Sequence, residues 1–226
     1  MAAAEAFHDP ADAWLYPEEL AAVARAVEKR RREFATVRLC ARRALAALGV
    51  PPVAVVPGER GAPGWPEGVV GSMTHCPGYR ASAVAFTRDV VALGLDAEPN
   101  TPLSRAALEA VTVGEERTLL AELLDEWPHV HWDKLLFSAK ESVYKTWFPL
   151  AGRGLRFTEV EVVIDPGGAF AARLPAPAPA AGGRDLPELT GRWLVRDGLI
   201  LTAVAVSAGA HEYGHDNSVR NSSITL

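Results

Sequence analysis

Three acidic side chains in two short clusters are the clearest candidates for chemistry in this chain. Asp96 and Glu98 end an apolar run, and Glu141 lies further along between Lys140 and Lys145. Side chains alternate along a strand, so Asp96 and Glu98 would face the same side. Two neighbouring carboxylates repel one another unless a cation compensates, and magnesium prefers oxygen ligands. The acids could therefore hold magnesium with a phosphorylated ligand; two solvated acids at a strand end are the alternative.

The second cluster is expected to lie on a helix. One apolar stripe recurs there at helical intervals, formed by Leu136, Ala139, Val143 and Trp147. Glu141 and Lys145 lie on roughly the opposite face, where they could form an ordinary helix salt bridge worth about 0.2 to 0.5 kcal/mol. In the functional interpretation, Glu141 faces a cleft as a metal ligand or proton acceptor. Lys140 and Lys145 would then reach phosphate oxygens as point charges.

A third group of polar side chains follows a short predicted strand. Residues 69–76 run from Val69 into a small polar turn before Pro77 and Gly78. The Ser72 and Thr74 hydroxyls and the His75 imidazole converge there with backbone amides, and several such donors together can bind a phosphate. A turn that is only hydrogen-bonded structure is the alternative.

A basic segment, residues 29–43, is the fourth candidate. It holds seven Lys or Arg residues against one acid, Glu33, in a chain whose net charge is -5. Arg38 and Arg42 share a strip beside the core-facing residues Phe34, Val37, Ala41, Leu45 and Leu48. A solvated helix face is the alternative to recognition of a polyanionic small molecule, which guanidinium groups bind in a bidentate way.

Periodicity predicts the elements that position these side chains. In the first half we expect a helix at 29–48 and strands at 53–56, 69–73, 81–86 and 90–96. In the second half we expect helices at 104–110, 114–124 and 131–148, and strands at 159–164, 169–174, 191–196 and 199–207. Residues 175–187 are rich in Pro, Ala and Gly, which predicts a mobile surface loop.

The polar tail, residues 211–226, has no periodic apolar pattern and is predicted to be disordered. His211 and His215 lie four residues apart there. Without a helix pattern or a third ligand, they are not predicted to bind a metal.

These motifs resemble those of the 4'-phosphopantetheinyl transferases of the Sfp/EntD type, particularly the actinobacterial members. Residues 94–98 match the family's Gly-hydrophobic-Asp-x-Glu signature, and residues 137–145 match its aromatic-Ser/Cys-x-Lys-Glu-x-x-x-Lys signature. Residues 71–75 resemble its Gly-Ser-x-Thr-His turn, and residues 33–42 its basic helix. The resemblance runs from about residue 14 to residue 207.

The resemblance implies an α/β (α+β) fold of two related lobes, with the ligand site between them. Each lobe would be a small, mostly antiparallel sheet packed with a long helix. We expect residues 1–100 to form the N-terminal lobe and residues 101–210 to form the C-terminal lobe. Two lobes that share one crevice need no second chain, so we expect a monomer.

The resemblance also implies a role for each candidate residue. Magnesium, or manganese in its place, would be held by Asp96, Glu98 and Glu141, and Glu141 would also be the catalytic base. Lys145 would act with Glu141, and both Lys140 and Lys145 would steady the pyrophosphate of coenzyme A. The nucleotide end of coenzyme A would be bound by Arg30, Arg38, Arg42, Arg60, Ser72, Thr74 and His75. Pro57 stands where close relatives have a lysine, which leaves Arg60 as the basic residue of that loop.

The implied enzyme moves the 4'-phosphopantetheine group of coenzyme A to a serine of an acyl or peptidyl carrier protein and releases 3',5'-ADP. A metal-dependent nuclease or phosphohydrolase is one alternative, but it would need a broad basic surface, so nucleic acid is not an expected partner. A non-catalytic coenzyme A or nucleotide binder is the other, but this chain keeps every acid and both signature lysines.

Composition agrees with this assignment. The chain has 226 residues, 49% of them apolar, which is enough for a sizeable core. The two cysteines, Cys40 and Cys76, make no disulfide framework, and residues 1–12 lack a signal-peptide pattern, so we expect the reducing cytoplasm. The longest apolar stretch, residues 199–210, is too short to span a bilayer, so no membrane association is expected.

Overall fold

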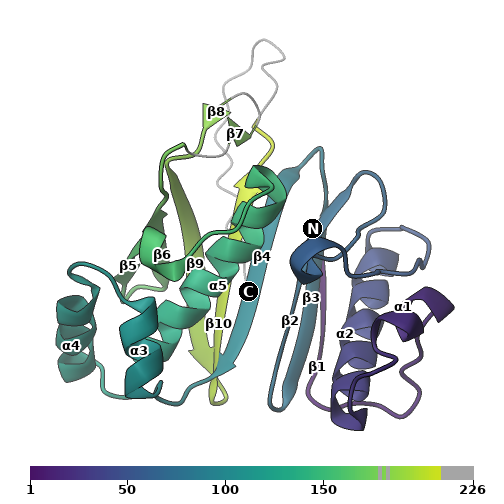
Figure 1. Ribbon diagram of the computed structural model, residues 1–226, viewed down its shortest axis with the longest axis horizontal. Helices are drawn as coiled ribbons and strands as arrows, with labels where there is room; N and C mark the ends of the chain where they lie inside the picture. Colours follow the sequence, from purple (N-terminus) through teal and green to yellow (C-terminus); the bar gives the residue numbers. More distant parts are fainter. Residues whose placement is uncertain (178–179, 182–183, 210–226) are drawn as a thin grey trace.

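A computed structural model describes residues 1–177, 180–181 and 184–209 of the chain. Within them, two antiparallel sheets lie side by side, each covered by one long helix (Figure 1). The smaller sheet has the strand order β1-β3-β2, and the larger has the order β4-β10-β9-β6-β5. The predicted class, a mixed α/β protein with mostly antiparallel sheets, is confirmed.

The helices are α1 (Pro17–Ala22), α2 (Glu28–Ala47), α3 (Arg105–Val111), α4 (Glu116–Glu126) and α5 (Trp132–Ala151). The strands are β1 (Ala2–Ala6), β2 (Val69–Cys76), β3 (Tyr79–Phe86), β4 (Val90–Pro99), β5 (Glu161–Asp165), β6 (Ala169–Arg173), β9 (Glu188–Arg196) and β10 (Leu199–Ser207), with the short pair β7 (Ala180–Ala181) and β8 (Arg184–Asp185). Two 3₁₀ turns are η1 (Glu59–Gly61) and η2 (Phe157–Glu159).

Helix α2 covers the smaller sheet through its apolar stripe. Ala41, Ala44 and Leu45 are fully buried and pack against Val69 of β2 and Val84 of β3. The predicted core face of this helix is therefore confirmed. The basic residues that the sequence singled out divide into two groups. Arg38 and Arg42 are buried, and the others are exposed: Lys29, Arg30, Arg31, Arg32 and Arg43.

Helix α5 covers the larger sheet through a deeply buried apolar stripe. The predicted stripe is confirmed, because its members are at most 1% exposed: Leu136, Ala139, Val143 and Trp147. They pack against Ile200 and Val204 of β10 and other side chains of the sheet. Burial of these large apolar groups fixes the rotation of α5 about its axis, and with it the direction of its polar residues.

The two sheets meet where β2 runs beside β4, and hydroxyl groups join them in place of a backbone ladder. The Ser72 hydroxyl accepts a hydrogen bond from the Leu95 amide at 2.9 Å, and the Thr74 hydroxyl accepts one from the Ala97 amide at 3.0 Å. Buried backbone amides need such partners. These two hydroxyls therefore hold β4 against the smaller sheet.

Gly94 lets α5 lie directly on β4. A Cβ atom at this position would sit 1.9 Å from the backbone oxygen of Ser142 and 2.4 Å from the Thr146 hydroxyl. Backbone cannot yield as a flexible side chain can, so only glycine fits. The glycine of the acidic signature thus sets the distance between α5 and the strand that carries Asp96 and Glu98.

Several expectations about the N-terminal half were wrong. Residues 53–56 form no strand, because the Val55 amide bonds to the Glu19 carboxylate at 2.8 Å instead of to a neighbouring strand. Strand β2 continues to Cys76, so the expected polar turn over 71–76 is a strand and the turn comes at Pro77 and Gly78. Strand β1 and helix α1 were not anticipated.

The other expected elements occur within about three residues of their predicted ends. Strand β4 pairs with β10, so the sheets divide the chain between β3 and β4, earlier than the expected lobe boundary at residue 100. The lobe bounds stay a prediction.

The expected loop 175–187 contains β7 and β8 and lies partly outside the described residues, and the tail with His211 and His215 lies entirely outside them. No helix in the described part combines the length and apolar character needed to cross a membrane.

Substitution of Gly94 tests the close approach of α5 to β4. We expect Gly94→Ala to lower the free energy of unfolding by about 3 kcal/mol, because its methyl group forces the helix off the strand. Gly58→Ala is the matched control, since a Cβ atom there meets only the Ala62 oxygen at an ordinary 3.5 Å. Chemical denaturation of both variants measures the difference; equal stabilities would show that α5 yields easily at this point.

Candidate active site

One face of α5 presents a row of polar side chains to β4. Lys134, Ser138, Glu141 and Lys145 follow one another at intervals of four, three and four residues, which places them along one side of a helix. The core stripe 136/139/143/147 fixes this orientation. Three of the four contact an acid of β4 directly.

Asp96 is the point where the polar row of α5 meets both sheets. Its carboxylate accepts hydrogen bonds from Lys145 Nζ at 2.7 Å, from the Ser138 hydroxyl at 2.8 Å and from the Thr74 hydroxyl at 3.3 Å. The residue is only 4% exposed. A buried carboxylate needs such partners to stay ionised. Asp96 is therefore held in place from α5 and from β2 at once.

Glu98 and Glu141 extend the acidic site away from Asp96. Glu98 lies 3.5 Å from Lys134 Nζ, and burial together with the neighbouring Asp96 charge raises its pKa. Burial also raises the pKa of Glu141; Lys145 opposes this effect, while Asp96 and Glu98 add to it. Glu98 and Glu141 thus sense the charges of neighbouring acids, and a cation near them would offset this repulsion.

The predicted three-carboxylate metal cluster is not formed in this conformation. Among the described residues, no three His, Cys, Asp or Glu side chains lie close enough together to hold a metal ion. The Asp96 oxygens bond to Lys145 and Ser138 instead. The donor set nevertheless fits a hard cation such as magnesium, because all its atoms are carboxylate oxygens. Burial, together with the charges of the neighbouring acids, raises the pKa of Glu98 and of Glu141.

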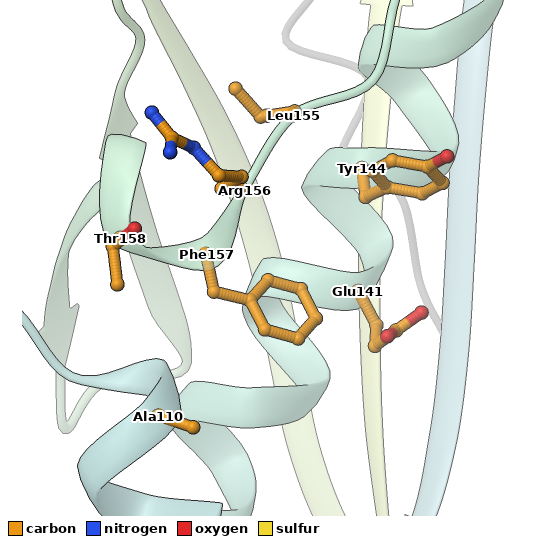
Figure 2. A pocket seen from close by; sticks show the side chains of 7 residues that line it. All are labelled: Ala110, Glu141, Tyr144, Leu155, Arg156, Phe157 and Thr158. Carbon is orange, nitrogen blue, oxygen red and sulfur yellow. The ribbon is translucent and has the colours of Figure 1, made fainter.

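A pocket of about 500 Å³ opens beside Glu141 (Figure 2). Its lining residues come from α3, α5 and the segment through η2: Ala110, Glu141, Tyr144, Leu155, Arg156, Phe157 and Thr158. The Phe157 ring projects from η2 toward Glu141, and it packs edge-on against Phe137 of α5. The pocket therefore combines mainly apolar walls with one carboxylate whose pKa is raised.

Lys140 does not reach the site for which it was predicted. Its ammonium group is fully buried and bonds to the Glu116 carboxylate at 2.8 Å, the Val111 oxygen at 2.7 Å and the Phe157 oxygen at 3.1 Å. Burial lowers its pKa, and Glu116 opposes that effect. With its three protons directed at these acceptors, Lys140 ties α5 to α4, to the end of α3 and to η2.

The Ser72 and Thr74 hydroxyls are likewise used inside the protein. Both bond to β4 at the junction of the sheets, and both residues are 3% exposed. The prediction that they grip a phosphate rested on an open turn, whereas here they lie in the middle of β2. His75, the next residue, points the other way and is more exposed.

A second polar cluster lies where α2 passes the end of β2. Arg30 contacts His75 Nε2 directly, and both groups surround the Glu33 carboxylate. Burial and the neighbouring Arg30 charge lower the His75 pKa to about 4, so this imidazole is neutral at pH 7. The structure thus brings Arg30 and His75 together, as the sequence predicted.

The remaining predicted arginines occupy different settings. Arg38 is buried, lies over the Phe34 ring and donates to the Val55 oxygen at 3.2 Å; burial lowers its pKa to about 10. Arg42 forms a buried ion pair with Glu19 at 3.3 Å, which ties α2 to α1. Arg60 is exposed, and its guanidinium lies beside Gly154 in the second half of the chain.

Two residues of the site were missed from sequence. Lys134 pairs with Glu98, and Ser138 bonds to Asp96, yet neither was assigned a role. Their spacing from Glu141, seven and three residues before it, was the available signal, because those intervals share one helix face.

Two protein-family models match this chain, and the boundary between them lies where the chain passes from the smaller sheet to the larger one. Residues 18–85 match the model of the 4'-phosphopantetheinyl transferase N-terminal domain. Residues 92–188 match the model of the 4'-phosphopantetheinyl transferase superfamily. The gap between the two matches falls between β3 and β4.

Full-length relatives agree with these models. The 4'-phosphopantetheinyl transferase Svp of Streptomyces mobaraensis is 57% identical over 197 residues, which are 87% of this chain and 80% of that protein. Npt of Nocardia iowensis is 46% identical over 89% of this chain and 94% of that protein. PptT of Mycobacterium tuberculosis is 42% identical over 91% of this chain and 92% of that protein. Both are also named as 4'-phosphopantetheinyl transferases. The chain is therefore an enzyme that belongs to the 4'-phosphopantetheinyl transferase superfamily, as its motifs predicted.

Proposed function

We propose that this enzyme transfers 4'-phosphopantetheine from coenzyme A to a serine hydroxyl of an acyl or peptidyl carrier protein. The observation that carries the assignment is the junction of β4 and α5, where Lys145 binds Asp96 and Lys134 pairs with Glu98, while Glu141 lines a pocket. A non-catalytic binder would not need three acids at this junction, two of them partly buried and with raised pKa values. A nuclease is not favoured either, because the family models and the relatives all name the transferase.

Asp96, Glu98 and Glu141 would hold the magnesium ion, or manganese in its place. When bound, the ion would neutralise charge on the pyrophosphate of coenzyme A and make 3',5'-ADP a better leaving group. The raised pKa values of Glu98 and Glu141 support this assignment, because burial, followed by the charges of the neighbouring acids, disfavours their ionised forms and a bound cation would offset both effects. The protein supplies the oxygen donors from a strand and a helix that are locked together at Gly94.

Glu141 would act as the general base. The serine oxygen forms a bond to the phosphorus that carries the pantetheine arm, the bond from that phosphorus to 3',5'-ADP breaks, and the serine proton passes to a Glu141 carboxylate oxygen. A carboxylate with a raised pKa accepts a proton more readily near neutral pH. Its position at the wall of the pocket allows direct access from solvent.

Lys145 and the pocket would orient the reacting groups. Lys145 Nζ contacts Asp96 and the Leu95 oxygen and is 26% exposed, so it can also reach a phosphate oxygen. The apolar walls formed by Tyr144, Leu155 and Phe157 suit the pantetheine arm. Lys140 holds η2, and thereby the Phe157 wall, through the Phe157 oxygen. Positioning of this kind supplies much of the rate in phosphoryl transfer.

The nucleotide end of coenzyme A would lie against the first half of the chain. Arg30 and His75 form the accessible part of the cluster at the end of β2, and Arg38 lies on the same helix two turns on. We assign the 3'-phosphate to this cluster. Arg42, Ser72 and Thr74, whose polar groups are bound within the protein, would support the site without touching the ligand.

The setting in the cell is part of the same proposal. Cys40 and Cys76 are free and buried, and burial raises the pKa of both thiols. Such thiols suit a reducing cytoplasm, where carrier proteins would be the partners. One chain supplies every proposed site residue, which supports a monomer.

Replacement of the base tests the catalytic assignment. We expect Glu141→Gln to lower the transfer rate by about 10²-fold or more, because an amide cannot accept the serine proton. Coenzyme A binding measured by calorimetry should weaken only modestly. If binding is lost to the same extent as the rate, then Glu141 serves chiefly to anchor the metal.

Replacement of Arg38 tests the proposed binding site for the nucleotide end of coenzyme A. We expect Arg38→Ala to raise the KM for coenzyme A about tenfold, with a much smaller rise for dephospho-coenzyme A, because only the former carries the 3'-phosphate. Arg43→Ala, an exposed arginine of the same helix, is the matched control. A rise of equal size for both substrates would remove Arg38 from the phosphate site.

Thermal unfolding tests the metal assignment without an activity assay. Magnesium at about 100 times its dissociation constant should stabilise the folded chain by about 2.7 kcal/mol and raise Tm by about 5 °C. Glu98→Gln should remove most of this shift, whereas Glu109→Gln, on exposed helix α3, should keep it. A shift that persists in Glu98→Gln would place the ion elsewhere.

A further inference from the structure

Glu33 lies at the centre of the basic cluster that ends β2. Its side chain is 13% exposed. One carboxylate oxygen lies 3.8 Å from Arg30 Nη1 and 3.9 Å from His75 Nε2. The other lies 3.6 Å from Arg80 Nη2 and 4.0 Å from Lys29 Nζ. A single acid is therefore shared among four nitrogen groups from α2, β2 and β3.

Arg80 gives this cluster a fixed base. Its guanidinium is 6% exposed and binds both oxygens of Asp9 at 3.0 Å each. It also donates to the Cys76 and Tyr79 backbone oxygens at the end of the β2–β3 hairpin. A bidentate, buried pair of this kind holds its geometry. Arg80 thus anchors the Glu33 carboxylate from the protein side.

The outer members of the cluster are far more exposed than Arg80. Arg30 is 47% exposed and His75 37% exposed, against 6% for Arg80. Without an acid between them, Arg30 and Arg80 would repel one another, and an exposed arginine side chain would turn toward solvent. Glu33 is one helical turn from Arg30, so it can restrain that side chain at little cost in conformational freedom.

We propose that Glu33 is a positioning residue that holds Arg30 and His75 in place to receive the 3'-phosphate of coenzyme A. The inference rests on the proposed function, which assigns that phosphate to Arg30 and His75. Glu33 acts through these two groups and does not touch the substrate. Its separations from both exceed hydrogen-bond length, so Glu33 does not occupy their N–H groups. Arg30 Nη1 contacts His75 Nε2, and the other guanidinium N–H groups of Arg30 stay available to a ligand.

Net charge alone would give the opposite effect when Glu33 is removed. Lys29, Arg30 and Arg80 are cationic, His75 is neutral at pH 7, and Glu33 and Asp9 are anionic, so the cluster carries a net charge of three minus two, or +1. Glu33→Gln makes this +2. If only net charge mattered, a phosphate would bind more tightly; if positioning matters, it binds more weakly.

The experiment measures steady-state kinetics and calorimetric binding with coenzyme A and with dephospho-coenzyme A. For Glu33→Gln we expect the KM and Kd for coenzyme A to rise about tenfold, those for dephospho-coenzyme A to change less than about twofold, and kcat to stay within about twofold. Glu28→Gln is the matched control, because Glu28 lies on the same helix and pairs only with exposed Arg32 among the described residues. It should leave all these values unchanged.

Asp9→Asn provides a second variant that leaves α2 intact. Loss of one Arg80 partner should draw that guanidinium toward Glu33 and raise the KM for coenzyme A about threefold, again with little effect on dephospho-coenzyme A. Tighter or unchanged coenzyme A binding by Glu33→Gln, or equal weakening of both ligands, would overturn the positioning role. If Glu33→Gln does not fold, an unchanged Asp9→Asn variant would overturn it.

The wild-type protein separates this inference from the function on which it rests. Equal affinity of the wild type for both ligands would refute the assignment of the 3'-phosphate to this cluster, and the role of Glu33 with it. Failure to load an apo carrier protein would refute the transferase assignment. Discrimination that survives in Glu33→Gln would refute only the positioning role.

Discussion

The close approach of α5 to β4 at Gly94 is the constraint on which the site depends. Because a Cβ atom there would lie 1.9 Å from the Ser142 backbone oxygen, the helix axis is held at one distance from the strand. The buried stripe of α5 then sets its rotation. Together these two restraints direct Ser138 and Lys145 onto Asp96 and leave Glu141 at the wall of the pocket.

The same strand joins the two halves of the molecule. Ser72 and Thr74 bond to the β4 backbone, and Thr74 also donates to the Asp96 carboxylate. Asp96 is thus bonded to both halves, so a shift between the sheets would move the acid that Lys145 contacts. The cluster proposed to bind the nucleotide lies further along β2, at His75. Strand β2 therefore contacts both the acidic site on β4 and the proposed nucleotide site.

Sequence patterns predicted the parts of the site that depend on local periodicity. Alternation along β4 and the helix spacing of α5 predicted that Asp96, Glu98 and Lys145 lie where α5 meets β4, and they do. Lys140 could not be placed in this way, because its buried partner Glu116 lies on another helix and only tertiary packing turns the lysine inward. The absent strand at 53–56 has the same cause, since the Glu19 carboxylate takes the Val55 amide.

In the proposed mechanism, Asp96, Glu98 and Glu141 bind one divalent cation together with the diphosphate of coenzyme A. A crystal structure of the enzyme with manganese and coenzyme A tests it most directly, because the anomalous signal of manganese locates the ion. We expect oxygens of all three side chains within about 2.0 to 2.3 Å of one ion that also contacts the diphosphate. An ion bound away from these residues, or by only one of them, would contradict it.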